Sequence, residues 1–86
     1  MNQKIMKQKE QNLVEIFNDE LDIQGDKKVV ASFAGRNFVT IVLPVGAAID
    51  LSELQEMAAN EKMIVGSLAS VLAGLRIEFW NDQRMN

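Results

Sequence analysis

Few side chains in this sequence are of the kinds that carry out chemistry. The 86 residues include no histidine, cysteine or tyrosine, so the usual general base and the most reactive nucleophile are both missing. We expect Ser67 and Ser70 to lie in an apolar helix, where hydroxyls commonly bond back to the preceding turn. A serine–lysine dyad with Lys62 has no support in the spacing. The serines therefore predict no nucleophilic site.

The acidic residues offer candidates for chemistry by type only. Glu53 and Glu56 could pair as in glycosidases, but acids near a helix start are favoured by the helix dipole and by solvation. A magnesium or calcium site from Asp19, Asp22 and Asp26 lacks the glycine-bearing spacing of an EF-hand loop. The glycines also lack the pattern of a phosphate-binding loop. We therefore expect no enzyme, no metal and no cofactor.

The basic residues suggest one alternative function, a small nucleic-acid-binding regulator. A basic arm and the tip of a hairpin could hold phosphates, and an asparagine beside them could contact a base edge. The net charge of −3 and the interspersed acids argue against this function, and exposed aromatic rings for stacking are not evident in the sequence. The residues of this alternative are Lys4, Lys7, Lys9, Lys27, Lys28, Arg36 and Asn37.

Length and composition favour self-association. A domain of this size has a small core and is usually reinforced by disulfides, a metal or oligomerisation. Without cysteine or histidine, good packing and oligomerisation remain. The absence of cysteine fits a reducing compartment, so we expect a cytoplasmic protein. The longest uncharged stretch in the C-terminal part, residues 63–75, is too short to span a bilayer.

The first half of the chain predicts a helix followed by a β-hairpin. Apolar residues at three- and four-residue spacing predict a helix to about Asp22, with residues 1–8 either a flexible arm or a helix that needs a partner. Residues 27–43 predict a hairpin that turns at 34–37. Its second strand, 38–43, is apolar on both faces, as in strands covered on both sides. In so short a chain another subunit could supply the second cover, although a strand buried within the monomer fits almost as well.

The second half predicts a helix with a well-defined start. Asp50 has the position of an N-cap with Glu53 three residues on. From Leu51 an apolar heptad stripe runs to residue 75, as one long helix or two broken near residues 60–62. Residues 76–80 predict a short third strand, although their spacing also fits a continued helix.

Two features of this half suggest an interaction surface. Small residues recur every four positions at Gly66, Ser70 and Gly74, which on a helix allows close packing against the domain's own sheet or against another helix. Phe79 and Trp80 form a pair that suits either a core or an interface anchor.

Together these patterns predict one α+β domain over residues 1–86. We expect an N-terminal helix, a β-hairpin, a long or broken helix and a short third strand, with the small antiparallel sheet packed on the helices. The expected function is a non-enzymatic protein-interaction or assembly module, that is, a small regulator, inhibitor or structural subunit. Its partners would be itself, as a homodimer or larger assembly, and an unidentified protein, with no membrane association.

Overall fold

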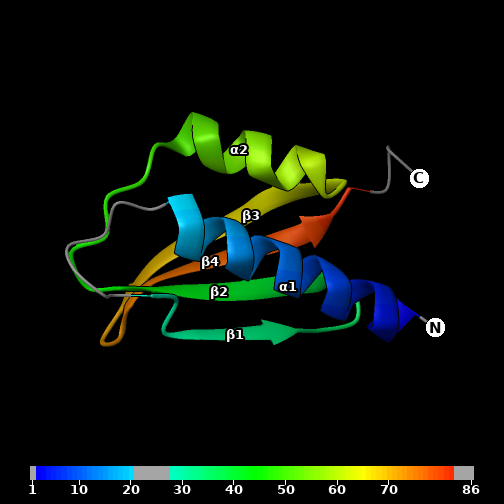
Figure 1. The fold of residues 1–86 in the computed structure, drawn as a ribbon, viewed down its shortest axis with the longest axis horizontal. Helices are drawn as coiled ribbons and strands as arrows, with labels where there is room; N and C mark the ends of the chain where they lie inside the picture. Colours follow the sequence, from blue (N-terminus) through cyan, green and yellow to red (C-terminus); the bar gives the residue numbers. More distant parts are fainter. Residues whose placement is uncertain (1, 21–27, 83–86) are drawn as a thin grey trace.

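The computed structural model describes residues 2–20 and 28–82, which form two helices and four strands (Figure 1). In chain order these elements are α1 (Asn2–Glu20), β1 (Ala31–Ala34), β2 (Phe38–Pro44), α2 (Leu51–Asn60), β3 (Met63–Val71) and β4 (Gly74–Asn81).

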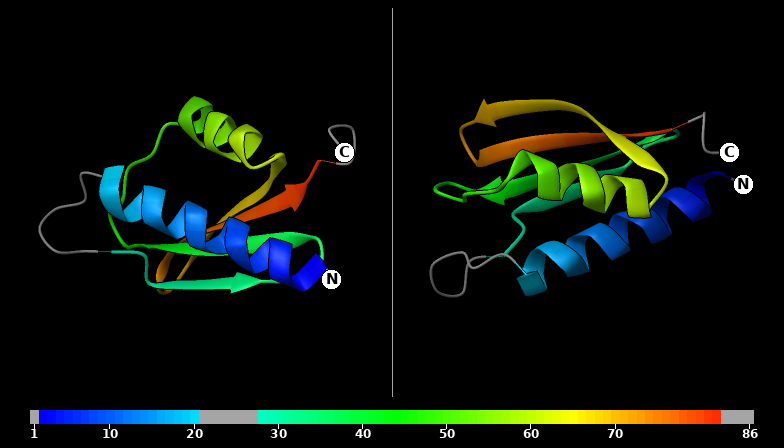
Figure 2. Two further views of the ribbon diagram at one scale, coloured as in Figure 1. Left: turned by 45° about the vertical axis from the view of Figure 1, so that its right-hand side comes forward. Right: turned by 90° about the horizontal axis from the view of Figure 1, so that it is seen from above.

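The strands form one open sheet in the order β1-β2-β4-β3, and every neighbouring pair is antiparallel. Both helices pack on the same side of this sheet, as Figure 2 shows from two directions. The arrangement confirms the predicted α+β class with an antiparallel sheet against helices. No described helix is long and apolar enough to cross a membrane.

The core lies between the sheet and the helices. The stripe predicted on the first helix is confirmed, because Leu13 and Phe17, one turn apart, are both buried. The Phe17 ring lies 6.2 Å from that of Phe79 on β4, centroid to centroid. The other fully buried large side chains come from both helices and three strands: Met6, Val39, Ile41, Leu43, Leu54, Met63 and Ile77.

The start of the chain is helical over the described part of the predicted arm. Residues 2–8 form the first turns of α1, and Met6 is buried there. The sheet provides its cover, since the Asn81 amide at the end of β4 lies 3.3 Å from the Met6 sulfur. Lys9 donates to Asn81 Oδ1 at 3.0 Å. The helix alternative therefore holds, with the domain's own last strand as the partner that it needs.

The predicted start of the second helix is confirmed. Asp50 has an extended backbone and its carboxylate accepts the Ser52 backbone N–H at 2.9 Å. Hydrogen bonds from the Ser52 backbone N–H and hydroxyl lower the pKa of Asp50 below its ordinary value. The helix ends at Asn60, and two residues later Lys62 has a left-handed backbone with φ of 58°.

The extension of this helix to residue 75 is wrong. The heptad stripe stops at Ala58, and residues 63–71 form β3, which pairs with β4 in a tight hairpin. Two local features oppose the helix: the left-handed Lys62 breaks it, and Ile64 and Val65 are β-branched. Gly74 is also not a helix stop, because it is the first residue of β4 and has φ of 142°. A Cβ at this position would clash with the Leu43 carbonyl oxygen, so the position requires glycine.

The predicted β-hairpin and the predicted strand at 76–80 are both confirmed. Ala34 pairs with Val39 in a hairpin, and the Gly35 N–H donates to the Phe38 carbonyl at 2.8 Å across its turn. Lys27, at the predicted start of this hairpin, lies outside the described residues. Residues 76–80 lie within β4, so the strand alternative holds there.

Candidate interaction face

The sheet has one face that the two helices leave uncovered, and we call it the open face. Since antiparallel partners point to the same side of a sheet, the register assigns its side chains to four rows across the strands. The aromatic row contains Phe38, Trp80 and Ile64; the glutamate row Phe33, Thr40, Glu78 and Ser67; the arginine row Ala31, Val42, Arg76 and Ala69; and the end row Pro44, Gly74 and Val71.

Three aromatic rings form a continuous cluster at one end of the open face. The Phe38 ring lies 6.0 Å from Phe33 and 5.1 Å from Trp80, centroid to centroid. Such tilted pairs stabilise each other beyond the area they bury. Phe33 remains 59% exposed, Ile64 42% and Trp80 39%. The cluster is thus held in place within the monomer while much of its apolar surface faces outward.

Two glycines, one on β3 and one in the turn between β1 and β2, leave the space that these rings occupy. A Cβ on Gly66 would lie 2.1 Å from Trp80 Cδ1, and a Cβ on Gly35 would lie 2.3 Å from Phe38 Cε1. Gly66 is also the extra residue of a β-bulge in β3, between Val65 and Ser67. The bulge keeps Ile64 and Ser67 on the same side, so β3 contributes one residue to each of the four rows of the open face.

Two charged side chains lie next to each other on this face. Arg76 and Glu78 are two residues apart on β4, so both point to the open side, in neighbouring rows. They are the charged residues of the four described strands. Glu78 Oε1 also accepts a hydrogen bond of 2.9 Å from the Trp80 indole Nε1, which orients the ring on the face.

The predicted small-residue surface does not exist as a helix face. Gly66 and Ser70 lie on β3 and Gly74 on β4. Gly74 and Phe79 are buried within the monomer, so neither can form a contact with a partner. Of the predicted interface residues, Trp80 contributes its side chain to the open face, and Gly66 provides the space in which the Trp80 ring packs.

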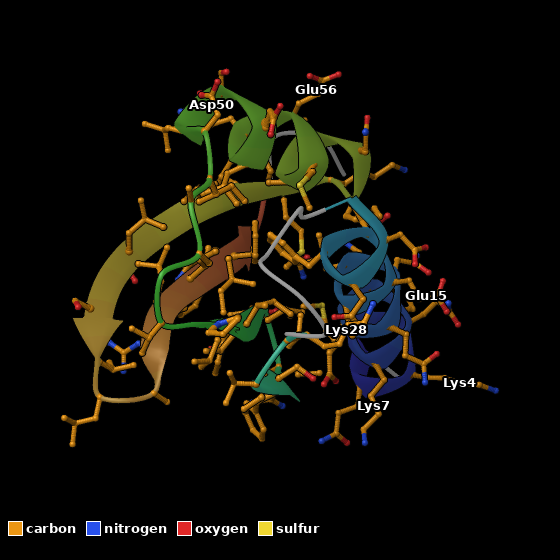
Figure 3. All side chains as sticks on the ribbon, turned by 60° about the vertical axis from the view of Figure 1, so that its left-hand side comes forward. Lys4, Lys7, Glu15, Lys28, Asp50 and Glu56 are labelled. Carbon is orange, nitrogen blue, oxygen red and sulfur yellow. The ribbon has the colours of Figure 1, made fainter. Side chains whose placement is uncertain are left out.

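The predicted basic residues are not gathered on one surface. Lys4 and Lys7 point away from the sheet on α1, and Lys28 lies near the other end of that helix (Figure 3). Lys28 donates to the Asn18 carbonyl at 3.2 Å. Arg36 and Asn37 lie in the exposed turn between β1 and β2, and Lys27 lies outside the described residues.

The Lys9 side chain forms a contact between α1 and the sheet. The Lys9 side chain is partly buried, and its ammonium donates to Asn81 Oδ1 at the end of β4. Burial lowers its pKa, nearby Glu61 opposes this shift, and Lys62 adds to it. Lys9 therefore ties α1 to the sheet.

The described residues contain no cluster of three or more potential metal ligands. A groove between the helices is lined by Ile16, Met57, Asn60 and the carboxylates Glu53 and Glu56. Glu56 points outward on α2 in Figure 3. Among the described residues that line this groove there is neither a basic residue nor a nucleophile.

The chain matches no protein-family model, no curated protein and no solved structure at a significant level. The open face is therefore the main guide to function. Sequence reasoning did not identify Phe33, Phe38, Ile64, Arg76 and Glu78 as members of one surface. The available signal was the doubly apolar second strand, which did indicate a face that needs a cover.

Proposed function

We propose that the protein is a non-enzymatic interaction or assembly module that works as a homo-oligomer through the open face of its sheet. The observation that carries the proposal is the partly exposed aromatic cluster on the sheet face that the helices leave uncovered. Contiguous exposed apolar surface of this kind usually marks an interaction site. Aromatic residues are also the side chains most enriched at the centres of interfaces.

The position of β2 supports the same proposal. This strand lies inside the sheet with apolar residues on both sides, and the helices cover the side of Val39, Ile41 and Leu43. Phe38 and Val42 point to the open face. A central strand with two apolar faces is typical of sheets that are covered on both sides. A partner on the open face would provide the second cover.

The test is the absolute mass of the protein by light scattering, compared with that of two matched variants. Phe33→Ser removes an exposed ring from the open face, and Ile5→Ser removes a side chain of nearly equal exposure, 58%, from α1 on the opposite layer. We expect an oligomer for the wild type and for Ile5→Ser, and dissociation for Phe33→Ser. A wild-type monomer at high micromolar concentration would refute self-association.

The nucleic-acid alternative gains one observation from the structure. The rings of Phe33, Phe38 and Trp80 provide the exposed stacking surface that single-stranded nucleic acids use. The cations, however, lie on α1, at Lys28 beside the end of α1 and in the turn at 35–37, and Arg76 shares the open face with Glu78. Nucleic-acid binding should raise the ultraviolet absorbance ratio of the purified protein, weaken steeply with salt and fall in Lys28→Glu.

A further inference from the structure

The charges of the open face are arranged so that the face is complementary to itself. Arg76 and Glu78 occupy neighbouring rows of the same strand, and β4 is flanked on both sides by other strands. Consider a two-fold axis that lies parallel to the sheet, runs perpendicular to the strands and passes midway between the arginine row and the glutamate row. Rotation about this axis places each of these rows opposite the other row of the second copy. Arg76 of each copy would then lie opposite Glu78 of the other, in an isologous contact formed by the same surface of both copies.

We propose that the partner on the open face is a second copy of this chain, packed sheet against sheet about that axis. The inference rests on the proposed function and adds the surface, the symmetry and the residues that fix the register. Stacked sheets lie about 10 Å apart, a gap that an arginine and a glutamate can bridge from opposite sides.

The sizes of the side chains match in the same arrangement. The axis brings the glutamate row of one copy over the arginine row of the other, so Phe33 lies over Ala31 and Ser67 over Ala69. It also brings the aromatic row over the end row, whose exposed member, Val71, is smaller than the opposing Ile64. The large Phe33 therefore faces the small Ala31, as interdigitating layers require.

The other two-fold arrangement of the same faces is disfavoured by charge. An axis parallel to the strands, between β2 and β4, leaves each row facing its own copy. The two Arg76 side chains would then lie close together in one row and the two Glu78 side chains in the next. Like charges opposed within an interface weaken binding and exclude that register.

The area of the face predicts a reversible dimer. Four strands at about 4.8 Å spacing, of which β2 has seven residues at about 3.3 Å rise and β1 has four, give a planar face of at most roughly 20 Å by 23 Å per copy. This lies toward the small end of specific interfaces. We therefore expect dissociation in the micromolar range, which light scattering and sedimentation can follow.

The experiment uses two charge reversals and their mixture. Arg76→Glu leaves two carboxylates on each face, and Glu78→Arg leaves two cations. We expect each variant alone to be a folded monomer, with its dissociation constant raised at least about tenfold. An equimolar mixture should form a one-to-one heterodimer, and the double exchange Arg76→Glu with Glu78→Arg should restore the homodimer. Circular dichroism of each variant checks that the fold is kept.

The outcomes separate the inference from the function on which it rests. A wild-type oligomer that is unaffected by either single reversal would overturn the sheet-to-sheet register and leave the oligomer to another surface. Single variants that dissociate without any heterodimer in the mixture would likewise refute the pairing of Arg76 with Glu78. A wild type that stays monomeric at every concentration would remove the proposed function itself.

Discussion

The contact between Gly66 and Trp80 can be tested by giving the glycine a methyl group. In Gly66→Ala the new Cβ would lie 2.1 Å from Trp80 Cδ1 and 2.6 Å from Nε1, well inside the contact distance of roughly 3.5–4 Å between unbonded atoms. The backbone of Gly66 is not in the left-handed region, so it can accept alanine. The indole ring must therefore move.

The structure sets the size of the effect. A displaced ring loses its pairing with Phe38, about 0.5–1.5 kcal/mol, and its hydrogen bond to Glu78, about 0.5–1.5 kcal/mol. Replacing glycine in a strand stabilises the protein by about 0.5–1 kcal/mol, which offsets part of this loss. We expect Gly66→Ala to lower the free energy of unfolding by about 0.5–2 kcal/mol.

A double-mutant cycle isolates the contact. In a Trp80→Ala background the ring is absent, so Gly66→Ala should stabilise the protein by about 0.5–1 kcal/mol. The free energies come from urea unfolding followed by far-ultraviolet circular dichroism, at one low protein concentration because association would add stability. A coupling energy below about 0.5 kcal/mol would show that Gly66 and Trp80 act independently, and the explanation of the glycine would be wrong.

Two further predictions concern the ends of α2. Lys62 holds a left-handed backbone with φ of 58°, so Lys62→Gly should raise the free energy of unfolding by about 0.5–1 kcal/mol in urea titrations; no gain would mean that its side chain offsets the strain. Asp50→Ala removes the cap on Ser52 and should lower the melting temperature at neutral pH. Because the folded pKa of Asp50 lies below its ordinary value of 3.8, the cap stabilises the protein above that value and is lost as the pH falls through the folded pKa. The two melting temperatures should converge in acid, and a constant difference would contradict this reasoning.

The fold was predictable where local physics decides it. The helical stripe of Leu13 and Phe17, the cap at Asp50 and the hairpin at Gly35 each rest on interactions between neighbours in sequence. The failure at residues 63–71 has a physical cause. Leu68, Leu72 and Leu75 fit helical spacing, but the pairing of β3 with β4 places Leu68 on β3, Leu72 in the exposed turn and Leu75 on β4.

The candidate site was harder to predict because it depends on register. Phe38, Trp80 and Ile64 belong to three strands, and their shared row follows from pairings over long separations in sequence. The bulge at Gly66 shifts the other three rows by one residue on β3 relative to this row. A sequence pattern cannot supply that shift, although the double apolar character of β2 did indicate that its second face needs a cover.

The strand order also has a consequence for how the protein is made. β4 is the last strand in chain order, yet it lies inside the sheet, between β2 and β3. During synthesis on the ribosome, β2 and β3 therefore have no direct pairing, and the core stays open until β4 inserts between them. Until then the apolar edge of β2 is exposed to neighbouring chains. Folding should be a late and concerted event, and the nascent chain is most prone to aggregate just before its last strand emerges.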